Sequence, residues 1–186
     1  NQLLKTDGSG NLGWADDANA SRTLLSTTTL SGTSTSTSIT TTGYHSLEGV
    51  VYNLDTTGSN TGDMWLRING DTGSNYHWAI HRQDHAGSPS HSAYGGISTS
   101  GFFFNNTGSS GFTNGNNQSN FFLYNINESG VRVNYHAINC GDYSATSGKP
   151  IIHTAAFWDS TAAITSLSIN TSNTMDGGTL KVWGVK

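Results

Sequence analysis

The sequence predicts an all-β protein, an antiparallel β-sandwich of the jelly-roll-like kind with a short irregular segment at its N-terminus. Three observations lead to this prediction. Ser, Thr, Asn and Gly number 25, 25, 19 and 23 and make up about half of the 186 residues, and Thr favours strands while Gly and Asn favour tight turns. Short apolar runs recur between such turns, without helical periodicity. Aromatic residues reach 10%, too many for a solvated linker.

The first residues differ from the rest of the chain. Asp7-Gly8 and Ser9-Gly10 are turn signals, and the apolar residues around them are isolated. Residues 21–42 are almost wholly Ser and Thr, which favours one or two strands with a break near Gly32, a low-complexity linker being the alternative. We therefore assign residues 1–20 to an irregular, shaft- or linker-like segment and residues 21–186 to the sandwich domain.

Strand-like runs alternate with turns from residue 43 onward. Between Asp63 and Asn69, apolar residues recur with a period of two, as a half-buried strand requires. The last run places Leu180 and Val182 on one face and Trp183 on the other. The strands predicted after residue 43 span 44–54, 63–69, 76–83, 120–127, 131–139, 150–158, 164–170 and 178–185.

Residues 87–118 are different, because they are rich in Gly, Ser and Asn and yet contain five aromatic residues. A long loop with aromatic residues is usually functional or packed on itself. Cys140, the only cysteine, lies in a strand-like run, and we expect it to be a small buried residue.

Charge and composition exclude several classes of function. With eight Lys and Arg and a net charge of −4, the chain lacks the basic surface that nucleic acids or anionic lipids require. No apolar run is long enough for membrane insertion. One cysteine allows neither an intrachain disulfide nor a cysteine-rich zinc site. Since the chain begins with Asn1 and not Met, we expect it to be a fragment or a processed product.

Candidate metal sites are weak, and we predict neither a metal nor another cofactor. His77, His81 and His85 recur at every fourth residue, which on a helix would place them together. On a strand they share a face but lie ~13 Å apart from one to the next, too far for one metal. A calcium site from loop oxygens, including Asp71, remains an alternative to simple turn capping.

We also predict that the chain is not an enzyme and has no catalytic residues. Histidines near Asp84 could form a general base with an orienting carboxylate, but no Gly-x-Ser-x-Gly nucleophile elbow is present. Glu48 and Glu128 are the only glutamates, and most aspartates lie in turns. A polysaccharide-cleaving enzyme therefore stays a minor alternative.

Two segments carry a resemblance to a known family. The first runs from Trp65 to Tyr76 and contains Asn69-Gly70-Asp71-Thr72-Gly73-Ser74-Asn75. The second begins at Trp158-Asp159-Ser160 and continues to the terminal Leu180-Lys181-Val182-Trp183-Gly184-Val185-Lys186. Both resemble the C-terminal β-sandwich domain of bacteriophage tail fibre and minor tail proteins, in which Tyr is usual where Trp183 stands. The opening, Leu4 to Trp14, is similar to short segments of phage fibre shafts.

The resemblance spans residues 3–14 and 44–186 and implies a structural protein of the virion, on the tail or capsid surface. It further implies a homotrimer that contacts other virion proteins and carries over no catalytic residue. The function that we favour is attachment to a host-surface glycan or protein receptor. The alternatives are a capsid decoration or head-fibre protein and a carbohydrate-binding module without viral origin.

For a receptor-binding role, the candidate contact residues are those of the predicted loops, because aromatic residues dominate contact surfaces. An equally weighted alternative is that these aromatic residues close the core beneath the long loop. The candidate ligand- or receptor-binding residues are His85, His91, Tyr94, Phe102, Phe103, Phe104 and Phe112.

Overall fold

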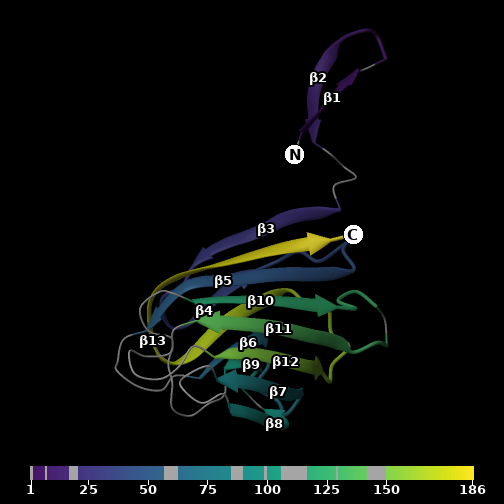
Figure 1. Cartoon of the computed structure of the whole chain (residues 1–186). Coiled ribbons are helices and arrows are strands. Elements are labelled where there is room, and N and C mark those ends of the chain that lie inside the picture. Colours follow the sequence, from purple (N-terminus) through teal and green to yellow (C-terminus); the bar gives the residue numbers. More distant parts are fainter. Residues whose placement is uncertain are drawn as a thin grey trace.

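The computed structural model describes residues 2–6, 8–16, 21–56, 63–84, 90–98, 100–105, 117–128, 130–141 and 150–186, and it confirms the predicted all-β, antiparallel sandwich class. Every strand pairing is antiparallel (Figure 1). The strands are β1 Gln2–Thr6, β2 Leu12–Asp16, β3 Arg22–Thr29, β4 Gly32–Ser38, β5 Ser46–Thr56, β6 Met64–Ile68, β7 Tyr76–Asp84, β8 Ser90–Ser98, β9 Phe102–Asn105, β10 Asn117–Tyr124, β11 Val133–Gly141, β12 Ile151–Trp158 and β13 Ser166–Val185.

Strand β13 joins two facing layers, because its two halves pair with different neighbours. Its first half, Ser166–Thr171, lies between β4 and β6, and β9 extends this short layer beyond β6. Its second half, Met175–Val185, lies between β3 and β5. From β5, the long layer continues through β10, β11, β12 and β7 to β8. The long layer therefore ends at β3 on one edge and at β8 on the other.

The core between the layers is built around the aromatic residues of β9. The Phe102 ring stacks on Tyr135 of β11 at 4.5 Å, and Phe104 meets Phe121 of β10 edge-on at 5.8 Å. The backbone of β9 is also bound, since Asn139 donates to the Phe104 carbonyl at 2.7 Å. Buried aromatic rings supply most of the apolar area that holds two sheets together.

The prediction of a long loop over residues 87–118 is wrong in the part of this range that the structure describes. Strands β8 and β9 lie within this range, and β10 begins at its end. Glycine and serine between the aromatic residues obscured the two-residue period, and the pairing of β8 with β7 over nine residues overrides this weak local preference.

Phe102, Phe103 and Phe104 are consequently not ligand-facing. They are 0%, 8% and 0% exposed, so the prediction of a contact role was wrong and the core alternative is confirmed for these three residues.

Further boundaries shift for similar reasons. The strands predicted over 164–170 and 178–185 are one continuous strand, β13, and the strand predicted over 120–127 lies earlier, at β10. Leu180 and Val182 face the core, while Trp183 faces outward, as predicted. Cys140 is exposed and not buried, because the alternation of β11 places Asn139 in the core instead.

Residues 1–20 contain a hairpin where an irregular segment was expected. Strands β1 and β2 pair from Gln2–Asp16 to Thr6–Leu12. Gly8 and Gly10 both have positive φ angles, so the turn signals reverse the chain between two short strands. Leu4 and Leu12 are 55% and 69% exposed, and Figure 1 shows the hairpin extending away from the sandwich.

The segment after β6 connects the two regions that carry the family resemblance. The Asn69 side chain accepts the backbone N–H groups of Thr165 and Ser166 at 2.8 and 3.1 Å. The Asp71 carboxylate accepts the Trp158 indole N–H at 2.6 Å and the Gly73 backbone N–H at 2.8 Å. Turn capping is thus confirmed for Asp71.

The titration of Asp71 reflects these contacts. Burial raises the pKa of this carboxyl, but hydrogen bonds from Asn75, Trp158 and Gly73, together with the charge of Arg67, outweigh burial and hold its pKa below the usual value. The ionised carboxylate therefore stabilises the turn.

Candidate binding face

The outer face of the long layer is a broad surface of paired strands that the short layer does not cover. Side chains of adjacent antiparallel strands stand opposite one another in rows that cross the strands. Over β12, β7 and β8 these rows are Phe157–His77–Ile97, Ala155–Ala79–Gly95 and His153–His81–Ala93. A row of small residues thus lies between two rows that contain larger side chains.

This arrangement produces a shallow groove of about 420 Å³ that opens to solvent. Ala79 and Ala155 are exposed on its floor, and His77 and Phe157 form one side. Trp78, Ala156 and Gly96, which lie between these positions along the strands, complete the lining. The groove is mainly apolar, because three alanines, a glycine, Trp78 and Phe157 make up most of its lining.

The side formed by His77 and Phe157 is held by several contacts. The two rings are parallel within 9° and 4.5 Å apart. The Arg132 guanidinium lies 5.1 Å from the centre of the Phe157 ring. Asp159 binds Arg132 at 2.7 Å and lies 3.9 Å from the His77 imidazole. These neighbours restrict the rotamers of both rings, so the side of the groove is formed before a ligand binds.

On the other side of the alanine row, the next row of side chains, which is not part of the groove's lining, contains imidazoles. His81 stands directly across from His153, and the His81 and His91 rings are 5.8 Å apart. The prediction that His77 and His81 share one strand face is confirmed, because both alternate with the buried residues of β7. Within the described residues, no three His, Cys, Asp or Glu side chains are placed to hold a metal ion.

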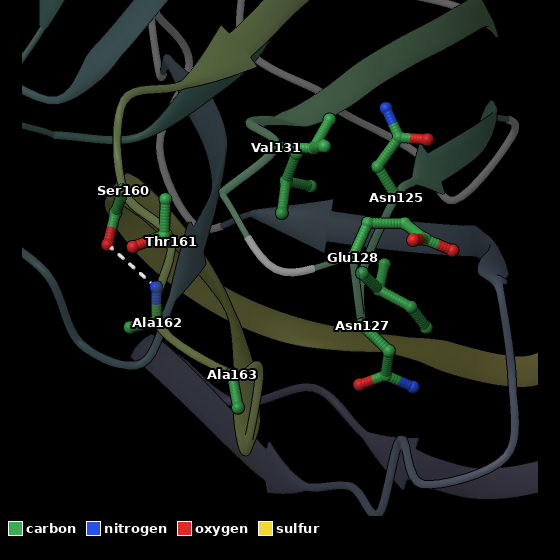
Figure 2. Close-up of a pocket in the computed structure, with 10 residues that line it drawn as sticks. Asn125, Asn127, Glu128, Val131, Ser160, Thr161, Ala162 and Ala163 are labelled. Atoms are coloured by element: carbon green, nitrogen blue, oxygen red, sulfur yellow. Dashed lines mark hydrogen bonds between the residues drawn. The ribbon is translucent and has the colours of Figure 1, made fainter.

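A second pocket lies at the end of the sandwich where two connecting segments meet. Figure 2 shows residues 160–163 facing Asn125, Glu128 and Val131 across it. The Ala162 backbone N–H donates to the Ser160 hydroxyl at 3.2 Å, which shapes one side. Its volume of about 190 Å³ is below the range of about 300–1,000 Å³ typical of small-molecule sites, so the groove is the better candidate.

The structure separates the predicted contact residues into three sets. His91 and Tyr94 are exposed on β8, where His91 shares the outer face with the groove and Tyr94 points to the opposite face. Phe102, Phe103 and Phe104 lie in the core. His85 and Phe112 lie outside the described residues.

The sequence did not predict that the lining residues together form a groove. Ala79 and Ala155 carry no chemical signal by themselves, and their importance depends on lying side by side. The alternation of β7 and β12 can be read from the sequence, but the register that pairs Ala79 with Ala155 cannot, because it depends on which strands become neighbours.

Among the described residues, no helix is long and apolar enough to span a membrane. Comparisons with protein-family models, with curated proteins and with solved structures give no match to this chain.

Proposed function

We propose that this chain is a virion structural protein, a tail-fibre or fibre-tip domain that attaches a bacteriophage to its host surface. The observation that carries the proposal is that the two edges of the long layer differ in what lies beside them. Its β3 edge follows the shaft-like hairpin in the chain, whereas the groove crosses β12, β7 and β8 at the opposite edge. A contact site remote from the connection to a shaft is what a fibre tip requires.

The proposal also depends on the family resemblance, whose two segments meet around Asn69 and Asp71. The resembling segments are separated by about eighty residues in sequence, yet Asn69 binds Thr165 and Asp71 binds Trp158 directly. The two segments that carry the resemblance therefore belong to one structural unit.

A homotrimer is part of the proposal. Leu4 and Leu12 on the hairpin and Leu24 on the edge strand β3 are more than half exposed in the single chain. Copies of the chain packed around the hairpin would cover these leucines and remove apolar area from water. Native mass spectrometry of the full chain should give three times 19.7 kDa.

Attachment is tested with the fluorescently labelled full chain on a panel of bacterial strains. Flow cytometry should detect saturable binding to particular strains, and excess unlabelled chain should compete for it. Uniform or absent binding by a folded trimer would contradict attachment and favour the alternative role, a capsid decoration or head-fibre protein. Release of reducing ends from host polysaccharide would instead require an enzyme.

A further inference from the structure

We propose that the groove over β12, β7 and β8 binds an uncharged saccharide. This inference rests on the proposed attachment function and specifies the chemistry of the receptor. It also moves the contact site from the predicted loops to a sheet face, with Ala79 and Ala155 as the floor and His77 and Phe157 on one side. His81 and His153 stand in the row beyond the other side.

The floor matches one property of a sugar ring. A pyranose has carbon-bound hydrogens on its faces and hydroxyl groups around its rim. Ala155, Ala79 and Gly95 form a row without side chains beyond a methyl group, so a flat ring can approach the sheet closely. Contact with this floor would remove apolar area of the ring from water.

The sides match the hydroxyl rim. A neutral imidazole offers one hydrogen-bond donor and one acceptor, and a hydroxyl group likewise donates and accepts. His77 lines one side of the groove, and His81 and His153 stand in the row beyond the other side, so hydrogen-bonding groups flank the alanine floor in both directions along the strands. The stacking of His77 on Phe157 fixes the first side in advance, which lowers the entropy cost of binding.

The charges around the groove favour an uncharged ligand. No Lys, Arg, Asp or Glu is among the lining residues. The nearest ion pair, Arg132 with Asp159 at 2.7 Å, is internally neutralised behind the Phe157 ring. An acidic saccharide would find no cationic partner at the floor, and burying its unpaired charge would be costly.

The size of the groove argues against a protein as the occupant. About 420 Å³ lies within the range of about 300–1,000 Å³ that is typical of small-ligand sites. A specific protein partner requires about 800 Å² on each side, far more than seven lining residues provide.

The first experiment applies the full chain to a glycan array that carries neutral and acidic oligosaccharides. We expect binding to a subset of neutral members, and calorimetry with the strongest of them then gives the affinity. Ala79→Gln and Ala155→Gln place a longer side chain on the floor, and each should weaken binding by at least about tenfold. Phe157→Ala should weaken it similarly through loss of one side.

The matched control is Ala162→Gln, which makes the same substitution at an exposed alanine in the other pocket. It should leave the affinity unchanged, and thermal unfolding should show that all four variants remain folded. Binding to acidic members only, no binding to the array, or neutral binding that the folded floor variants leave unaltered would each overturn the inference. A change in the mass of the assembly caused by the floor variants would identify the groove as a contact between copies and would also overturn it.

Cell adsorption distinguishes the two proposals. If the full chain adsorbs to cells and Ala79→Gln adsorbs equally well, the saccharide groove is wrong while attachment stands. If the chain binds neutral glycans through the groove but adsorbs to no strain, attachment is wrong while the groove stands.

Discussion

The two faces of the long layer are both rich in aromatic residues, but they use them differently. On the inner face, Phe102 and Phe104 from the short layer fill the space against Phe121 and Tyr135, and all four are at most 2% exposed. On the outer face, Phe157 stacks with His77 beside a row of alanines that leaves a groove. Aromatic content is therefore similar on the two faces, and the residues between the aromatic ones decide whether a packed core or an open groove results.

Truncation of an inner ring should give the largest effect. Phe104→Ala removes a fully buried ring from between the layers, and we expect a loss of about 3–5 kcal/mol in the free energy of unfolding. Tyr124→Ala is the control on the outer face, where the ring is 44% exposed, and it should cost less than about 1 kcal/mol. Similar losses in urea unfolding of both variants would contradict the difference between the faces.

A smaller loss of stability is expected when a methyl group is added to a glycine that an aromatic ring covers. A Cβ at Gly49 of β5 would lie 1.9 Å from the Phe121 ring, so Gly49→Ala must displace that ring and should cost about 1–3 kcal/mol. Gly177→Ala is the matched control, since a Cβ there has no atom within 4 Å. Thermal unfolding of the two variants side by side measures the difference, and equal melting temperatures would show that the inner face tolerates the added methyl.

The turn at Asp71 lies outside both faces. A substitution there should cause an intermediate loss of stability that depends on pH. Because the folded state lowers the pKa of this carboxyl, its contribution is present at neutral pH and is lost as the pH falls through the folded-state pKa. Asp71→Asn should cost about 1 kcal/mol at pH 7, and the difference from the wild type should shrink below a pH of about 4. Urea unfolding at pH 7 and pH 3 tests this, and a constant difference would contradict it.

The smallest change in stability should come from removing one buried hydroxyl group on the inner face. The Tyr135 hydroxyl is buried and has no hydrogen-bond partner among the described residues, and burial raises its pKa. Tyr135→Phe should therefore be neutral or stabilise the protein by up to about 1 kcal/mol. Tyr76→Phe is the contrast, because the Tyr76 hydroxyl binds both the N–H and the carbonyl of Ile68. It should cost about 1 kcal/mol, and a clear loss in Tyr135→Phe would reveal an additional partner.

Most strands after residue 43 were predictable because their alternation is strong. Tyr76–Gln83 and Pro150–Trp158 were located within a residue or so, since their buried and exposed positions differ sharply in polarity. The short strands β8 and β9 were not, because serine and glycine in β8 give no alternation and consecutive phenylalanines in β9 give no period. Of the candidate contact residues that the structure describes, only His91 and Tyr94 are exposed as expected.

The sequence by itself determined the fold class, the low charge and the turns, because these depend on residue type and on neighbours along the chain. Only the tertiary structure decided that Phe102–Phe104 are core and that Ala79, Ala155 and His77 share a surface. The physical reason is that a side chain's face follows from local alternation, whereas its neighbours across the sheet follow from register and layer packing. These are fixed by contacts between residues far apart in the sequence.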